Sequence, residues 1–268
     1  MTSIDRRSAL RAGAGAALAG ALATSCTDGG RATEEHPAER HAAQEHAPEQ
    51  SAPSAAPSRP APGPRSFAGQ PAEIVHGPRD ADKVALTFHG HGDPATAKAL
   101  LAEAERAGAR LTVLAVGDWL DEHPALALRI LDGGHELGNH TQRHLSIAEL
   151  PEAQAYAEIA ECAQRLRKTT GSIGAWFRPS RTRLSTPLVT RLAHRAGYPH
   201  VLSYDVDSLD FTSPGASAVV GNVAGQIQRG SVVSLHFGYA DTVAALPALL
   251  DDLDRRGLRA VTTTELLT

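Results

Sequence analysis

From residue 83 onward, short apolar runs alternate with longer stretches in which apolar residues recur every three or four positions. The short runs predict buried β-strands, and the longer stretches predict amphipathic helices. The predicted strands are 84–88, 111–116, 135–138, 175–177, 200–204, 231–236 and 259–261. The predicted helices are 95–107, 124–131, 152–168, 186–196, 216–227 and 242–256. Strands separated by helices are typical of parallel βα units, so we expect an α/β fold.

Strands of this number and spacing favour a small, incomplete (β/α)7 barrel, although the pattern does not exclude a doubly wound open sheet. A barrel gathers its functional side chains beyond the carboxyl ends of the strands. Several polar residues stand at those places in the sequence: His89, His140, His144, Arg178, Asp205, Asp207 and His236. We therefore expect them to surround one mouth.

The N-terminal segment has the pattern of an export signal. Arg6-Arg7 precedes the small apolar residues 12–23, which are too few to span a bilayer. The paired arginines resemble a twin-arginine signal, so residues 1–26 are predicted to be an export signal. Cys26 follows small residues as in a bacterial lipobox, which predicts a lipid anchor at the outer face of the membrane. The alternative is a secreted protein with an unmodified Cys26.

Residues 27–72 are rich in Ala, Pro, Glu, Ser, Gln and His and nearly lack large apolar side chains. Such a segment buries too little apolar surface to offset the entropy of ordering it. We therefore predict a disordered linker over 27–72 and a folded domain over 73–268.

Composition narrows the function further. The chain has 268 residues, a net charge of −4 and two cysteines. This charge indicates no broad basic surface, so we expect no nucleic-acid partner, and we expect a monomer. Two cysteines exclude a disulfide scaffold. A Gly-x-Ser-x-Gly elbow, a P-loop and a Gly-x-Gly-x-x-Gly turn after a strand are all absent from the sequence, which disfavours serine hydrolases and nucleotide-binding enzymes.

Two histidines in Asn139-His140-Thr141-Gln142-Arg143-His144 are the first candidate metal ligands. On a helical turn, side chains four positions apart share a face, so His140 and His144 are predicted to ligate one cation from such a turn.

The order of the motifs resembles the polysaccharide deacetylases (NodB-homology domain, carbohydrate esterase family four), over about residues 74–267. The motif Asn-His-Thr/Ser-x-x-His is intact at 139–144. Shorter matches follow at 178–181 (Arg-Pro-Ser-Arg), 207–211 (Asp-Ser-Leu-Asp-Phe) and 234–236 (Ser-Leu-His). The resemblance implies the incomplete barrel and a metal-dependent deacetylase of glycans that contain N-acetylglucosamine.

The first family motif, Thr-Phe-Asp-Asp-Gly-Pro, departs from the pattern here. His89 replaces the catalytic aspartate and Gly90 replaces the aspartate that ligates the metal. His89 would complete a three-imidazole site, or His91 or Asp93 would supply the third ligand, or the protein binds no metal. We favour a repaired site in which His89, His140 and His144 hold a divalent ion, with zinc as the expected metal.

The resemblance also implies roles for the other motif residues. His236 would protonate the leaving amine and Asp207 would orient it, while Asp93 or His89 would act as the base. The backbone N–H of Arg181 would meet the oxyanion. Arg178 would lower the pKa of His89, and Phe211 would form an apolar wall.

The sequence thus predicts an exported, lipid-anchored, metal-dependent deacetylase of peptidoglycan or a chitin-like glycan. The alternative is a glycan-binding lipoprotein on the same fold that has no catalytic activity. Ser180, Arg181 and Ser234 make the expected acetyl pocket more polar than is usual in the family.

Overall fold

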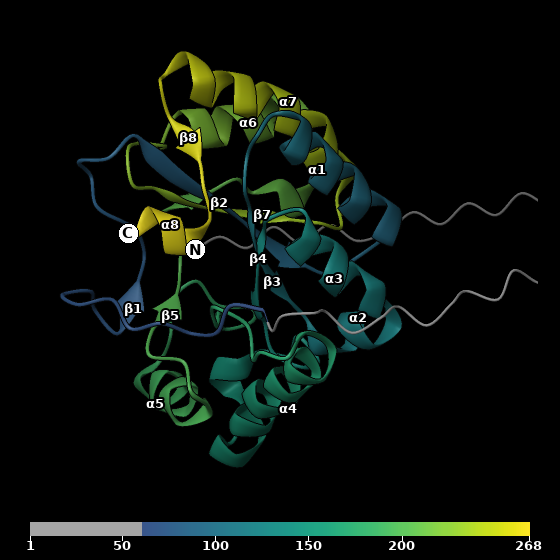
Figure 1. Ribbon diagram of the computed structural model, residues 1–268, viewed down its shortest axis with the longest axis vertical. Helices are drawn as coiled ribbons and strands as arrows, with labels where there is room; N and C mark the ends of the chain where they lie inside the picture. The colour runs from purple at the N-terminus through teal and green to yellow at the C-terminus, as the bar shows by residue number, and fades with distance from the viewer. Residues whose placement is uncertain (1–60) are drawn as a thin grey trace, which may run out of the picture. The chain divides into compact units, whose positions relative to one another are not determined.

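The computed structural model describes residues 61–268, in which short strands are enclosed by helices (Figure 1). The strands are β1 (Glu73–Ile74), β2 (Lys83–Gly90), β3 (Thr112–Ala115), β4 (Glu136–Asn139), β5 (Val201–Leu202), β6 (Val206–Asp207), β7 (Val232–His236) and β8 (Arg259–Ala260). The α-helices are α1 (Pro94–Arg106), α2 (Gly117–Glu122), α3 (Pro124–Asp132), α4 (Glu152–Thr170), α5 (Pro187–Ala196), α6 (Ala216–Ala224), α7 (Ala240–Arg255) and α8 (Thr263–Leu266). The 3-10 turns η1 (Ile147–Glu149) and η2 (Asp210–Thr212) complete the elements.

Every pairing between these strands is parallel, which confirms the predicted α/β class. The central sheet has the order β4-β3-β2-β7-β6, and β8 pairs with the start of β2. Beyond β4, Asn139 bridges to Phe177, and Phe177 bridges to Val201 of β5, which pairs with β1. The strands therefore follow a barrel-like arc, as the incomplete (β/α)7 barrel requires.

Each predicted helix is present, with ends shifted by a few residues, but the predicted strand at 175–177 is reduced to one bridging residue, Phe177. Gly174, in the left-handed region at φ 86°, and Pro179, which lacks an N–H, restrict the length that can pair. The segment still donates and accepts like a strand, since the amide of Arg178 donates to Asn139 O at 2.9 Å. It therefore carries Arg178 into the barrel.

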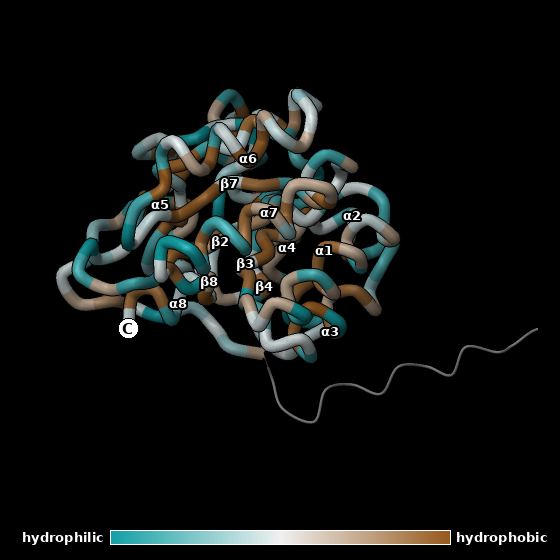
Figure 2. The backbone as a smooth tube through the Cα atoms, turned by 90° about the horizontal axis from the view of Figure 1, so that it is seen from above, coloured by the Kyte–Doolittle hydropathy of each residue, from teal (hydrophilic) through white to brown (hydrophobic). Residues whose placement is uncertain are grey.

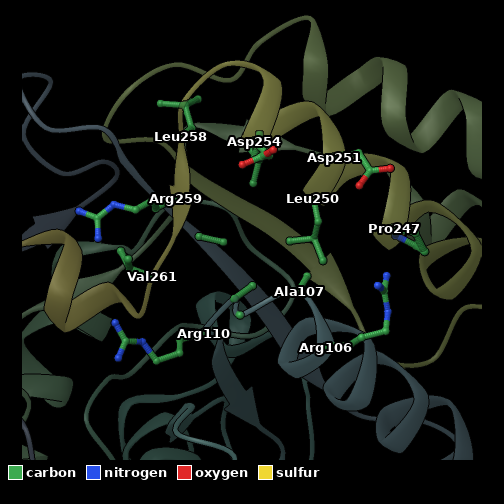
Figure 3. Close-up of a pocket in the computed structure, with 14 residues that line it drawn as sticks. Arg106, Ala107, Arg110, Pro247, Leu250, Asp251, Asp254, Leu258, Arg259 and Val261 are labelled. Atoms are coloured by element: carbon green, nitrogen blue, oxygen red, sulfur yellow. The ribbon is translucent and has the colours of Figure 1, made fainter.

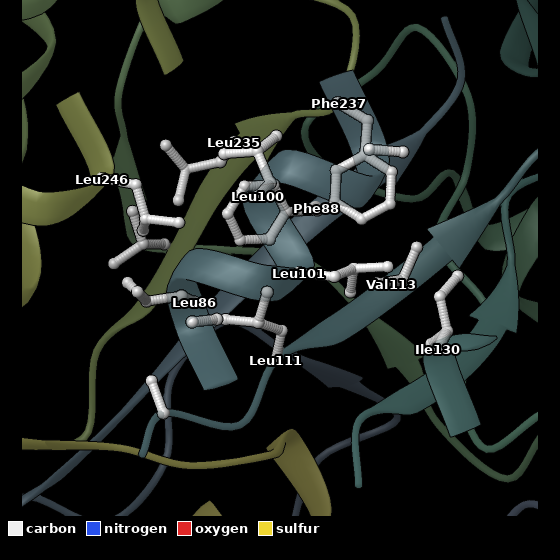
Figure 4. Close-up of a cluster of buried hydrophobic side chains, with 14 of the residues drawn as sticks. Leu86, Phe88, Leu100, Leu101, Leu111, Val113, Ile130, Leu235, Phe237 and Leu246 are labelled. Atoms are coloured by element: carbon white, nitrogen blue, oxygen red, sulfur yellow. The ribbon is translucent and has the colours of Figure 1, made fainter. Parts of the chain in front are cut away.

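Alternation along β2 separates the core from the interior of the barrel. Leu86 and Phe88 point outward and pack with Leu100 and Leu101 of α1 (Figure 4). Thr87 and His89 consequently face inward. Burying each large apolar side chain stabilises the fold by about 1.5–3 kcal/mol, so a shift of one residue in register is strongly disfavoured. Figure 2 shows apolar segments, among them β7, running inside the polar outer helices.

The described part of the predicted linker, residues 61–72, packs on the domain, so the predicted boundary at 72 lies too late in the chain. Phe67 stacks on Trp176 with ring centroids 5.5 Å apart. Its backbone N–H donates to Nε2 of His200 at 3.0 Å, and Ala61 N donates to Thr170 O at 2.9 Å. A single aromatic residue with a buried partner was enough to order this end of the linker.

The predicted export signal, the lipidation site Cys26 and the rest of the linker lie outside the described residues. Within residues 61–268, no helix combines the length and the apolar character that crossing a membrane requires.

Replacing Gly138 by alanine tests the packing inside the barrel. A Cβ at Gly138 would meet Leu114 Cδ1 and Trp176 O at 2.7 Å, so we expect Gly138→Ala to destabilise the protein by about 1–3 kcal/mol. The control is Gly221→Ala in α6, where a Cβ meets nothing within 4 Å. Alanine is the better helix former, so Gly221→Ala should raise the melting temperature. Equal melting temperatures for the two variants in thermal denaturation would contradict this view of the interior.

Candidate active site

A cavity of about 370 Å³ opens at the carboxyl ends of β2, β6 and β7. The residues that line it are His89, His144, Arg181, Thr182, Arg183, Tyr204, Asp207, Phe211, Ser234 and His236. This is the end of the strands where the sequence placed its polar residues, and the structure brings most of them together.

Three imidazoles meet at the inner side of this cavity. The parallel register pairs His89 of β2 with His236 of β7, and their ring centroids lie 4.3 Å apart. His140 follows β4, and its ring centroid lies 4.4 Å from that of His89. Strand register alone therefore sets the spacing of His89 and His236.

Hydrogen bonding determines which nitrogen of His140 is free. Its Nδ1–H donates to the carbonyl of Arg178 at 3.0 Å, so Nε2 carries the lone pair. Nε2 of His140 and Nε2 of His89 are both buried without a hydrogen-bond partner. Unpaired buried nitrogens are costly, and they indicate that this place is built for a ligand.

The segment 139–144 is not a helical turn, which corrects the expected geometry of the two histidines. Thr141 and His144 have positive φ values of 71° and 54°. The side chain of Asn139 holds the turn open, because its Oδ1 accepts from Thr141 N at 2.9 Å. The rings of His140 and His144 nevertheless lie close, with centroids 4.9 Å apart.

The histidines of the pocket are held neutral. Burial lowers the pKa of His144 to about 4, with help from the charge of Arg181. Burial likewise lowers the pKa of His89 and of His140 well below the ordinary value, and the charge of Arg178 adds to both shifts. A neutral imidazole is the form that ligates a metal or accepts a proton.

Arg178 lies fully buried beneath the pocket and no carboxylate pairs with it among residues 61–268. Its Nε donates to Leu202 O at 3.1 Å, its Nη2 donates to Thr87 Oγ1 at 2.9 Å, and its Nη1 has no partner. Burial lowers the pKa of Arg178 to about 10, so the guanidinium stays charged at neutral pH. The predicted effect of Arg178 on the pKa of His89 is confirmed in direction.

Asp210, not Asp207, orients His236. The Nδ1–H of His236 donates to Asp210 Oδ1 at 2.7 Å, and the backbone N–H of His236 donates to Oδ2 at 2.8 Å. Leu209 at φ 55° reverses the chain, which turns Asp210 toward β7. Burial alone would raise the pKa of Asp210, but hydrogen bonds from His236 and Thr242 outweigh it and lower the pKa.

The other predicted residues take separate places. Asp207 lines the cavity and accepts a hydrogen bond from Leu209 N at 3.1 Å. Phe211 lines the cavity 5.6 Å from the ring of His236, with 45% of its surface exposed. Arg181, at φ 55°, also lines it and donates from Nε to His144 O at 2.8 Å.

Asp93 is not placed for either of its predicted roles. Its carboxylate caps α1 by accepting from Ala95 N at 2.6 Å, it is exposed, and it is absent from the cavity wall. A helix N-terminus attracts an acidic side chain, so the capping interaction directs Asp93 away from the histidines. His91 is also exposed, and its ring stacks 6.1 Å from that of His144.

The donor set suits a divalent cation, although the ligands are not preassembled. Two unpaired Nε2 atoms and a third neutral imidazole are ligands that zinc accepts. Across residues 61–268, however, no three His, Cys, Asp or Glu side chains are grouped so that they could hold a metal ion. Position 90 does not supply a ligand, because a Cβ at Gly90 would meet Val113 Cγ1 at 2.9 Å and Ala115 Cα at 3.0 Å.

A second hollow, between α1, α7 and β8 (Figure 3), lies near the amino end of β2. Arginines and aspartates line it together with apolar residues, but it contains no histidine. Its position at the opposite end of the strands excludes it from the site described above.

Sequence reasoning missed Arg183 and Tyr204 as wall residues and treated Asp210 as a loop cap. The two acidic residues three positions apart in Asp207-Ser208-Leu209-Asp210 were a signal, but only the turn at Leu209 decides which of them faces His236.

Comparisons with known proteins place this geometry in a family. The sequence profile described as polysaccharide deacetylase matches residues 76–201. A peptidoglycan-N-acetylglucosamine deacetylase of Bacillus cereus is 31% identical over 194 residues, which cover 71% of this chain and 90% of that protein.

Two solved structures share the fold. A family 4 carbohydrate esterase pseudoenzyme of Bacillus anthracis is 23% identical with a TM-score of 0.70, covering 74% of this chain and 70% of that one. The family 4 carbohydrate esterase of Streptomyces lividans, in complex with acetate, is 26% identical with a TM-score of 0.62, covering 66% and 91%. The resemblance seen in the motifs is confirmed, and the chain belongs to the polysaccharide deacetylase family.

Proposed function

We propose that this protein removes acetyl groups from a glycan that contains N-acetylglucosamine. The observation that carries the proposal is the His236–Asp210 pair, which faces the unpaired Nε2 atoms of His89 and His140 around one cavity. An acid–base pair next to neutral nitrogen ligands is what hydrolysis of an unactivated amide requires.

His89, His140 and His144 would hold the divalent ion, with zinc as the expected metal. When bound, it would polarise the acetamide carbonyl and acidify a water molecule. The carbonyl of Arg178 fixes the tautomer of His140, because it accepts the proton on Nδ1. The buried guanidinium of Arg178 keeps His89 neutral and thus able to ligate.

His236 would serve as both base and acid, because His89 replaces the family's catalytic aspartate and Asp93 caps a helix. With its Nδ1 proton held by Asp210, Nε2 of His236 accepts the proton of the attacking water. The carboxylate stabilises the resulting imidazolium. The same proton then passes to the nitrogen of the breaking C–N bond, which releases acetate and a free amine.

The backbone N–H of Arg181 would meet the oxyanion. The left-handed conformation at φ 55° is unusual for arginine, and its side chain anchors the turn through His144 O. A residue held in a strained conformation next to a pocket is often placed there for function.

A glycan-binding protein without catalytic activity is the second candidate. His89 and Gly90 replace both aspartates of the first motif, and the residues that the structure describes contain no preassembled metal site. Metal content separates the two candidates.

We further propose that the protein is exported and lipid-anchored at Cys26. Arg6-Arg7, the apolar residues 12–23 and the small residues before Cys26 support this part of the proposal.

Metal binding tests the donor set. Zinc titration of the purified protein should give near-stoichiometric binding, and His140→Ala should weaken it at least about 100-fold. The control is His194→Ala, an exposed histidine of α5, which should bind zinc as the wild type does. A wild-type protein that binds glycan but neither zinc nor another divalent ion would instead support the non-catalytic candidate.

Catalysis tests the acid–base pair. His236→Gln should lower the rate of acetate release from N-acetylglucosamine oligomers by about 10²–10⁴-fold, with zinc content unchanged. Asp210→Asn should also lower it, because the imidazolium loses its stabilising charge, whereas His194→Gln should not. Retention of full activity in His236→Gln would refute the proposed role.

The depressed histidine pKa values predict a pH-dependent stability of the metal-free protein. The unfolded chain takes up protons on these imidazoles below about pH 6.5, whereas the folded protein does so only near or below the pKa of about 4 given by His144. Stability is therefore fully present above pH 6.5 and falls as the pH drops toward 4. Denaturant titrations across this range should show the fall, and His144→Gln should reduce its slope. A flat profile in the wild type would contradict the burial of neutral imidazoles.

A further inference from the structure

Two arginines on the cavity wall carry charges that the protein itself does not neutralise. Arg181 and Arg183 are both exposed and both line the pocket. In the described part of the chain, neither forms an ion pair with an acidic side chain. Arginines that line a pocket without a carboxylate partner are placed to receive an anion.

Arg183 is held against the wall by neutral groups. Its Nε donates to Tyr204 O and its Nη2 donates to Asp205 O, both at 3.3 Å. Its guanidinium lies 5.3 Å from the centroid of the Tyr204 ring. The nearby carboxylate of Asp205 is already engaged, since it pairs with Arg79 at 2.8 Å. The charge of Arg183 therefore stays available while its position is fixed.

Two further guanidinium groups add to the positive potential. Arg181 uses Nε to hold His144 O, which leaves its terminal nitrogens for a ligand. Buried Arg178 lies 5.4 Å from the centroid of the same Tyr204 ring, below the cavity floor. Against these three charges, the cavity wall contains one carboxylate, that of Asp207. The net field favours a negative group.

The rim of the same cavity offers apolar surface. The exposed large apolar side chains of the described residues are Leu145, Leu184, Leu209 and Phe211. Each lies on a loop that also supplies a residue of the cavity wall. Apolar side chains of this kind suit the flat faces of sugar rings, whereas a small free anion would not need them.

We propose that the substrate is an acidic glycan, in which a sugar next to the acetylated one carries a carboxylate that Arg181 and Arg183 bind. This inference rests on the proposed function and names the class of glycan within it. A carboxylate matches the planar, forked donors of a guanidinium. A neutral polymer of N-acetylglucosamine offers nothing to these charges.

Equilibrium binding tests the proposal without requiring catalysis. The probes are a tetrasaccharide of alternating N-acetylglucosamine and N-acetylmuramic acid, and the same tetrasaccharide with its carboxylates methylated. Titration calorimetry should give a Kd about tenfold lower for the acid than for the ester, as one charge-assisted contact provides. Arg183→Gln should bring this ratio close to one.

Two control variants exclude a merely structural effect. Asp207→Asn removes the opposing charge and should increase the preference for the acid, in the direction opposite to Arg183→Gln. Arg191→Gln, on an exposed arginine of α5 whose Nη1 donates to Pro187 O, should leave the preference as in the wild type. A loss of folding would not produce shifts of opposite sign.

Equal Kd values for the acid and the ester in the wild-type protein would overturn the inference. Acetate release, measured on the same two probes, reports on the proposed function separately. Preferential binding of the acid without acetate release would refute the hydrolase and leave the acidic ligand standing. Acetate release with equal Kd values would do the reverse.

Discussion

The parallel pairing of β2 with β7 is the constraint on which the site depends. Its register places His89 opposite His236, and the alternation along β2 turns Thr87 and His89 inward while Leu86 and Phe88 enter the helical shell. A shift of one residue would bury the imidazole among leucines and expose the core side chains to the cavity. The hydrophobic effect on the outer face thereby fixes the chemistry on the inner face.

Charge is distributed around this framework in an unusual way. Arg178 is fully buried without a carboxylate, although the resemblance pairs this position with the catalytic aspartate that His89 replaces. A buried charge without a partner is costly, and here it is met only by carbonyl and hydroxyl oxygens. Its effect on the site is to keep the neighbouring imidazoles neutral. The replacement of aspartate by histidine therefore changed a salt-bridged site into a cationic one.

The acid–base function is, in contrast, well supported by its surroundings. Asp210 is buried and accepts from the ring and the backbone of His236 and from the hydroxyl of Thr242. Such a carboxylate is fully satisfied and holds one tautomer of the imidazole. The rigid half of the site is thus the His236–Asp210 pair, while the metal-ligand half is not yet assembled among the residues described.

The sequence by itself determined the fold class, the order of the strands and helices, and the histidines that meet at the strand ends, because each depends on local periodicity and on where a strand stops. It did not determine which acid orients His236, since a left-handed residue at Leu209 makes that choice. Nor did it determine that Asp93 serves a helix, that the turn at 139–144 is not helical, or that Phe67 is drawn onto Trp176. Those outcomes depend on contacts between distant segments, which only the tertiary structure brings together.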